Sequence, residues 1–74
     1  MNLSAIGERI KIIRKEIANE SQERFAEQMC MTQSNLSLIE SQKGLPSCIL
    51  LYRLRDTYHI NLNWLLTGKG DIQL

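Results

Sequence analysis

One short stretch of the chain, residues 33 to 41, gathers side chains that can hydrogen-bond to the edges of nucleic-acid bases. Leu36 and Ile39 are three residues apart and share one face of a helix. The outward face then carries Gln33, Ser34, Ser37, Leu38 and Ser41. Glutamine can bond bidentately to adenine, serine can donate or accept at several base edges, and an apolar side chain can contact a thymine methyl group. The pattern therefore predicts a helix whose outward face fits the major groove of DNA.

A second short helix must precede this one and hold it in place. Its apolar residues Phe25 and Met29 are four residues apart and share a face. Ser21 and Thr32 each stand one residue before a helical pattern, where a hydroxyl can accept a hydrogen bond from the free amides of the first turn. Residues 22–41 are thus expected to form two capped amphipathic helices joined by a sharp turn.

Over most of its length, the chain resembles the lambda-repressor-like, Cro/CI-type (XRE) family of helix-turn-helix DNA-binding domains. The central match is QERFAEQMCMTQSNLSLIES at residues 22–41, followed by Pro46-Ser47. The flanking segments GERIKIIR (residues 7–14) and INLNWLLTG (residues 60–68) are similar to the family's first helix and closing segment. Three segments in the family's order are far more specific than a helix-turn-helix pattern alone. The resemblance implies an all-α, compact five-helix domain with its helix-turn-helix at the second and third helices.

The resemblance also implies roles for single residues. Gln33 and Ser34 match base-reading positions, and Leu38 matches a third base-facing position, although an outward leucine could equally pack on the loop at residues 44–45 or on a partner. Gln22 matches a phosphate-contacting position that also braces Gln33. Three further residues match contacts to the DNA backbone, namely Asn35, Ser41 and Lys43.

An ion pair between Arg14 and Glu40 is implied as well, because the family sets an arginine late in the first helix against a glutamate late in the recognition helix. Its role would be positional. Removing one partner of a deeply buried pair leaves an uncompensated charge and costs roughly 3 to 5 kcal/mol. Neither residue is expected to read bases.

Several positions depart from the family's pattern. Cys30 stands in the turn where the family has glycine, and because such turns favour a left-handed backbone, a non-glycine residue there costs on the order of 1 kcal/mol. Gln42 and Arg55 replace a glycine and a small residue. The loop before Gln22 is one residue longer than usual, and Glu20 replaces a leucine. We therefore expect local differences where the first two helices meet and around the fourth helix.

Helical periodicity accounts for the chain without any alternating run that would indicate a strand. The apolar stripe of the first helix consists of Leu3, Ile6, Ile10, Ile13 and Ile17. We expect one domain over residues 1–74, with helices at about 4–18, 22–29, 33–41, 47–58 and 62–66. The inward residues of the fourth helix are expected to be Cys48, Leu51, Leu54 and Tyr58. His59 should end that helix, Asn61 should cap the fifth, and Gly68 should end it.

The composition leaves little scope for other kinds of site. At 74 residues there is room for one small domain. Cys30 and Cys48 are too far apart in sequence for a metal-ligand pair, and His59 is the only histidine, which argues against a zinc site. We expect reduced, partly buried thiols, with a structural disulfide as the alternative. No cofactor and no small-molecule ligand is evident.

Neither a membrane location nor an enzyme is indicated. No apolar run is long enough to cross a bilayer, and the N-terminus lacks a basic segment leading into an apolar one, so a cytoplasmic protein is expected. Paired carboxylates, a nucleophile with a nearby base and a phosphate-cradling loop are all missing. The triplet at residues 68–70 lacks the preceding strand and the glycine spacing of a nucleotide site.

The net charge argues against DNA binding. Nine basic and eight acidic residues leave +1, whereas a strongly basic surface is the usual footprint of a DNA-binding domain. Affinity for DNA would have to come from local placement. The free amides of helix N-termini and polar side chains can both contact phosphates without a net positive charge.

A single module makes too few base contacts for high specificity, and proteins of this kind bind two half-sites about one helical turn apart. A homodimer is therefore expected. Ile49, Leu50 and Tyr52 lie beyond the expected inward set of the fourth helix and, with Ile72 and Leu74, could form the self-contact. Scattered exposed apolar residues are, however, also normal on a monomer.

These features favour a sequence-specific transcriptional regulator, of repressor type and of phage or bacterial kind, that binds double-stranded operator DNA. The alternative is a protein-interaction module, such as an antitoxin or adaptor, with the same fold. Near-neutral charge and the outward Leu38 favour that alternative. A third interpretation is the N-terminal piece of a longer regulator.

Overall fold

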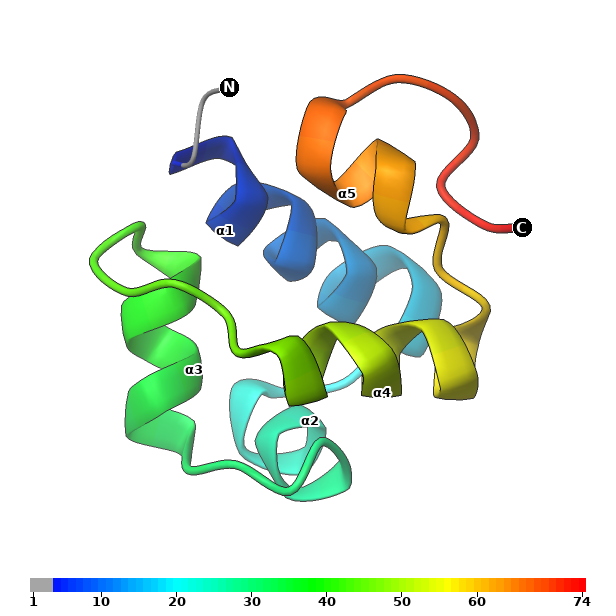
Figure 1. Ribbon diagram of the computed structural model, residues 1–74. Helices are drawn as coiled ribbons and strands as arrows, with labels where there is room; N and C mark the ends of the chain where they lie inside the picture. Colours follow the sequence, from blue (N-terminus) through cyan, green and yellow to red (C-terminus); the bar gives the residue numbers. More distant parts are fainter. Residues whose placement is uncertain (1–3) are drawn as a thin grey trace.

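The computed structural model describes residues 4–74, which form five α-helices and one π-helical segment (Figure 1). In chain order these are α1 (Ser4–Ile12), the π-helix η1 (Ile13–Ala18), α2 (Gln22–Gln28), α3 (Gln33–Glu40), α4 (Cys48–Tyr58) and α5 (Leu62–Thr67). The expected all-helical architecture is confirmed, and residues 60 and 73 add only an isolated antiparallel β-bridge. The last six residues of the first expected helix are π-helical, a correction to that prediction. Within residues 4–74, no helix is long and apolar enough to cross a membrane.

Local capping sets where the helices begin. The expected caps are confirmed: the side chains of Ser21, Thr32 and Asn61 accept hydrogen bonds from backbone amides at 3.2, 3.1 and 3.0 Å. Ser47 is also a cap rather than the first helical residue, since its hydroxyl accepts from a backbone amide at 3.1 Å. His59 ends α4 in the left-handed conformation at φ 56°. Each of these residues satisfies backbone groups that a helix end leaves unpaired.

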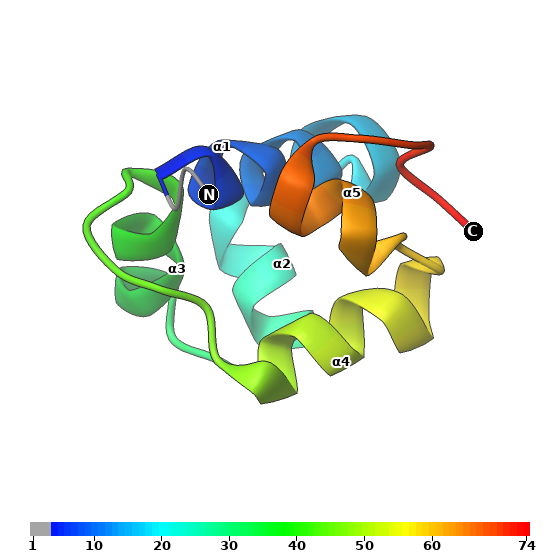
Figure 2. The same ribbon diagram turned by 45° about the horizontal axis from the view of Figure 1, so that its top comes forward.

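The α1–η1 unit runs across the domain, with α3 near its first turns and α5 beside it, while α2 and α4 lie on its other side (Figures 1 and 2). The apolar side chains of these helices meet in one core. The largest fully buried residues are Phe25, Ile10, Ile13, Met29, Leu36, Ile39, Leu54, Ile60 and Leu65. Of the stripe expected on the first helix, Ile6, Ile10 and Ile13 are buried and Ile17 is partly buried, whereas Leu3 lies outside the described residues.

Gly7 allows α1 to cross α3 at very short range. A Cβ atom built on Gly7 would lie 2.0 Å from the carbonyl oxygen of Ile39, a distance at which something must shift. Only a residue without a side chain permits this approach. The crossing fixes the C-terminal turn of α3 against the first helix.

Two expectations about α4 are wrong. The helix buries Leu50 and Leu54, which are 3% and 0% exposed, and leaves Cys48 exposed. Residues 50, 54 and 58 are spaced four apart, so they share the face that meets the core. Leu50 is therefore a core residue and is not available for the self-contact that was expected of it. The expectation of partly buried thiols is also wrong, because both Cys30 and Cys48 are free and exposed.

Candidate nucleic-acid interface

A shallow, open hollow lies over the outward side of α3 and the start of α2. The residues that line it are Gln22, Gln33, Ser34, Ser37 and Leu38. The last four are exposed, and Gln22 is half-buried. The fold thus brings together, on one face, the four residues expected to read bases and one of the four expected to contact phosphates. A continuous face of amides, hydroxyls and one apolar side chain can make the contacts that base edges in the major groove offer.

A buried ion pair holds this face in position. Arg14 donates from Nε to Oε2 of Glu40 at 2.7 Å and from Nη2 to Oε1 at 3.0 Å, which is the two-pronged geometry that suits a guanidinium and a carboxylate. Both residues are buried, at 8% and 7% exposure. The remaining Nη1 of Arg14 donates to the backbone carbonyl of Glu20 at 3.0 Å. The pair therefore ties η1 to the end of α3 and to the loop that precedes α2.

Gln22 is attached to this ion pair. Its amide Nε2 donates to Oε1 of Glu40 at 3.0 Å, so the hydrogen bond of Gln22 is to Glu40 and not to Gln33, which it was expected to brace. A carboxylate can only accept, which fixes the amide with its nitrogen toward Glu40 and its oxygen away from it. Sequence reasoning missed this contact, because the two residues are 18 positions apart and on different helices.

The other three residues expected to contact phosphates lie outside the hollow. Asn35 lines a separate hollow with the turn at residues 29–32 and the start of α4. The hydroxyl of Ser41 donates to the carbonyl of Leu38 at 3.2 Å, and the backbone amide of Lys43 donates to the same carbonyl at 2.8 Å. All three side chains are exposed. Asn35 lies in the first turn of α3, whereas Ser41 and Lys43 follow its last turn.

Leu38 remains largely uncovered by the adjoining loop. The residue is 48% exposed, and its Cβ lies 3.6 Å from where a Cβ on Gly44 would stand. The leucine faces outward beside the polar residues of α3.

Left-handed backbone geometry occurs at two positions where the resemblance implied glycine. Cys30 has φ 57°, as expected for this turn, and Gln42 has φ 70°. A side chain in this region is strained, which explains why glycine suits both positions. The two residues reverse the chain at the end of α2 and at the end of α3.

The acidic residues are spread unevenly along the chain. Between residues 28 and 55 the only acidic residue is Glu40, and it is buried against Arg14. The outward side of α3 and the loop after it therefore carry no exposed carboxylate. The exposed acidic residues are elsewhere, at Glu8, Glu16, Glu23, Glu27, Asp56 and Asp71.

Comparison of the chain with protein-family models, with curated proteins and with solved structures finds no match. The function that follows rests on the hollow over α3 and on the distribution of charge around it.

Proposed function

We propose that the protein binds double-stranded DNA sequence-specifically and regulates transcription, as a lambda-repressor-like domain of the Cro/CI (XRE) type. In this proposal α3 is the recognition helix and enters the major groove. The observation that carries it is the hollow whose lining combines Gln22 with Gln33, Ser34, Ser37 and Leu38 on one exposed, acid-free face. Phosphates repel carboxylates, so a face that carries no carboxylate can approach DNA closely.

Each lining residue has a defined task under this proposal. The amide of Gln33 and the hydroxyl of Ser34 stand at the start of α3, the end that meets base edges in helix-turn-helix complexes. Ser37 and Leu38 follow one turn later and supply a hydroxyl and an apolar contact for a thymine methyl group. Gln22, held by Glu40, forms the wall of the hollow and keeps a second amide hydrogen for the DNA.

Two copies of the chain would bind together. A two-fold arrangement places the recognition helices in successive major grooves, about one helical turn apart. With Leu50 in the core, the exposed apolar residues left on α4 are Ile49 and Tyr52, at 61% and 64% exposure. We assign the self-contact to these two.

A protein-interaction module, such as an antitoxin or adaptor, is the second candidate function. The observation that favours it is the exposed apolar pair Leu38 and Leu45, at 48% and 66% exposure, on a domain whose net charge is only +1. Exposed leucines beside a polar face suit a protein partner as well as a thymine methyl group.

Selection of binding sites from random duplex DNA tests the proposal. The purified chain is expected to enrich a palindromic site at low salt, and Gln33→Ala with Ser34→Ala is expected to abolish the enrichment, because each good base contact is worth roughly 1 to 3 kcal/mol. Thr57→Ala, an exposed polar change on α4, is the control and should leave the site unchanged. If no sequence is enriched even at low salt, DNA reading is refuted and the protein-interaction function becomes the better account.

A further inference from the structure

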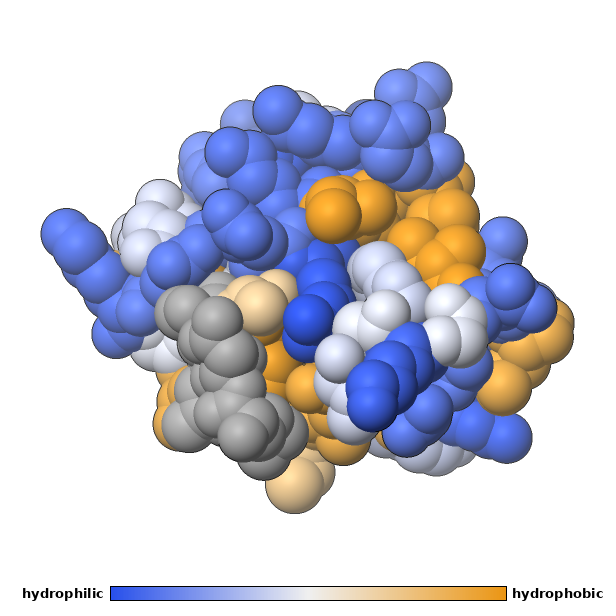
Figure 3. All heavy atoms as spheres, turned by 90° about the horizontal axis from the view of Figure 1, so that it is seen from above, coloured by the Kyte–Doolittle hydropathy of each residue, from blue (hydrophilic) through white to orange (hydrophobic). Residues whose placement is uncertain are grey.

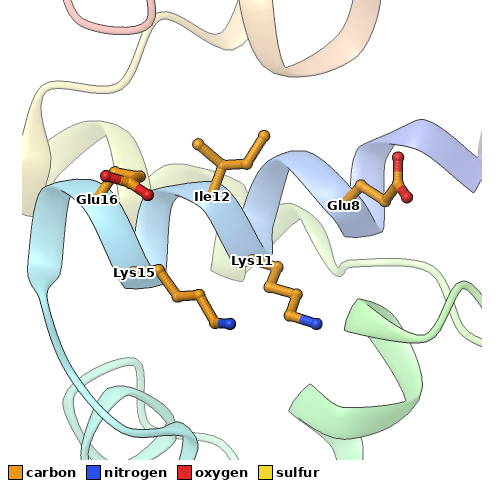
Figure 4. Close-up of a pocket in the computed structure, with 5 residues that line it drawn as sticks. All are labelled: Glu8, Lys11, Ile12, Lys15 and Glu16. Atoms are coloured by element: carbon orange, nitrogen blue, oxygen red, sulfur yellow. The ribbon is translucent and has the colours of Figure 1, made fainter.

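A pair of lysines lies on the outer surface of the first helix. A second open hollow there is lined by Glu8, Lys11, Ile12, Lys15 and Glu16 (Figure 4). Lys11 and Lys15 are four residues apart, and Glu8, Ile12 and Glu16 are likewise spaced by four, so each set forms its own row along the helix. Both lysine side chains are exposed. The surface of this helix is therefore divided into a basic row and a row that is acidic and apolar.

The basic row lies on the side of the helix that meets α3. Gly7, one turn before Lys11, is the residue that touches the carbonyl of Ile39 near the end of α3. Arg14, three residues after Lys11, reaches Glu40 in the last turn of α3. Lys11 therefore stands between the two points at which the first helix contacts the recognition helix.

The direction of the side chains agrees with this placement. Figure 4 shows Lys11 and Lys15 pointing to the side of the helix on which α2 and α3 lie, whereas Glu8 and Ile12 point to the other side. Figure 3, which looks onto α1 and α5, shows apolar patches interrupted by hydrophilic side chains on that face. Ile12 is 42% exposed. The two lysines thus lie on the side of the first helix nearer to α2 and α3, and Ile12 lies on the other side.

The two ammonium groups have no counter-ion in the part of the chain that is described. The one ion pair found among residues 4–74 joins Arg14 to Glu40 and involves neither lysine. It also neutralises Glu40, the acidic residue at the end of α3. Like charges four residues apart on a helix repel each other by a few tenths of a kcal/mol. An anion placed beside both lysines would remove that repulsion.

We propose that Lys11 and Lys15 bind phosphates of the DNA strand that flanks the groove entered by α3. This inference rests on the proposed function and extends its interface from the helix-turn-helix to the first helix. The two lysines would neutralise backbone charge and carry no sequence information, because phosphate contacts fix register and affinity but do not distinguish bases.

The salt dependence of DNA binding tests this inference. Binding of the selected duplex and of a scrambled duplex is measured at several potassium chloride concentrations for the wild type, Lys11→Gln, Lys15→Gln and Lys69→Gln. Lys69 is the matched control, because it is an exposed lysine in the segment after α5, a segment that runs apart from α3 (Figure 1). Circular dichroism of each variant verifies that the helices are retained.

Each of Lys11→Gln and Lys15→Gln is expected to flatten the slope of log K against log salt by about 0.9, the value for one released phosphate contact. Both should weaken binding to the selected and scrambled duplexes by the same factor, and Lys69→Gln should keep the wild-type slope. If the wild type prefers its selected duplex but all three variants share its slope, only the phosphate contact is overturned. A wild type that does not prefer the selected duplex overturns the proposed function itself, and with it this inference.

Discussion

Breaking the buried pair of Arg14 and Glu40 should cost a large share of the stability of this domain. Glu40→Leu leaves a guanidinium that is 8% exposed with two N–H groups unpaired, and it also removes the acceptor of Gln22. Uncompensated buried charges of this kind cost about 3 to 5 kcal/mol. A 74-residue domain at 0.05 to 0.15 kcal/mol per residue has about 4 to 11 kcal/mol in total. The single change should therefore remove at least about a quarter of the free energy of unfolding and lower the urea midpoint accordingly.

Urea unfolding followed by circular dichroism and by the fluorescence of Trp64, the only tryptophan, measures this loss. Arg14→Met should cost a similar amount, since it leaves the carboxylate buried without its partner. The double variant Arg14→Met with Glu40→Leu should be more stable than either single variant, because it leaves neither charge uncompensated. Glu27→Leu, which changes an exposed carboxylate, is the control and should stay within about 0.5 kcal/mol. Losses below about 1 kcal/mol in both single variants would refute this reasoning, because that is the value of an ion pair exposed to water.

Three smaller predictions concern backbone geometry and one partly buried phenol. Gly7→Ala should destabilise the folded domain by about 1 to 3 kcal/mol or more, because the new Cβ would meet the Ile39 carbonyl oxygen at 2.0 Å. Gly44→Ala is the control and should melt close to the wild type, because its nearest neighbour would be at 3.6 Å. Equal melting temperatures for the two variants would contradict the close crossing of α1 and α3. Cys30→Gly should raise the melting temperature by up to about 4 to 8 °C, which corresponds to about 1 kcal/mol, because it relieves the left-handed strain at φ 57°. Cys30→Ala keeps the Cβ and should leave the melting temperature unchanged. Burial raises the pKa of Tyr58 above its ordinary value of 10.0, so the stability contributed by the neutral phenol is complete below pH 10.0 and is lost as the pH rises further. Urea midpoints at about pH 9 and about pH 11 should therefore fall less in Tyr58→Phe than in the wild type, and an equal fall would count against this assignment.

Features with a local cause could be predicted from the sequence. The outward face of α3 follows from the three-residue spacing of Leu36 and Ile39, which are both buried. The cap at Thr32 follows from a hydroxyl placed one residue before a helical pattern. In both cases the physics acts within a single turn of helix, so neighbouring residues are sufficient to determine it.

Features that depend on distant residues could not be predicted in the same way. The start of α4 has four successive apolar residues at 48–51, so its periodicity does not select one buried face, and only contact with the rest of the core assigns Leu50 to the interior and Cys48 to the surface. The π-helix at the end of the first helix has no residue signal of its own. The hydrogen bond from Gln22 to Glu40 depends on how two helices meet.

The net charge of +1 does not weigh against DNA binding once the positions of the charges are known. Charges in solvent are screened over about 8 to 10 Å at physiological salt, whereas the domain measures 28 by 23 by 20 Å. A phosphate placed against α3 therefore responds mainly to charges on that helix, on the loop after it and on the nearest edge of the first helix. Across α3 and this loop the single acidic residue is cancelled by Arg14, and Lys43 is exposed. The exposed carboxylates belong to other segments of the chain, so they lower the net charge without adding negative charge to α3 or to the loop after it.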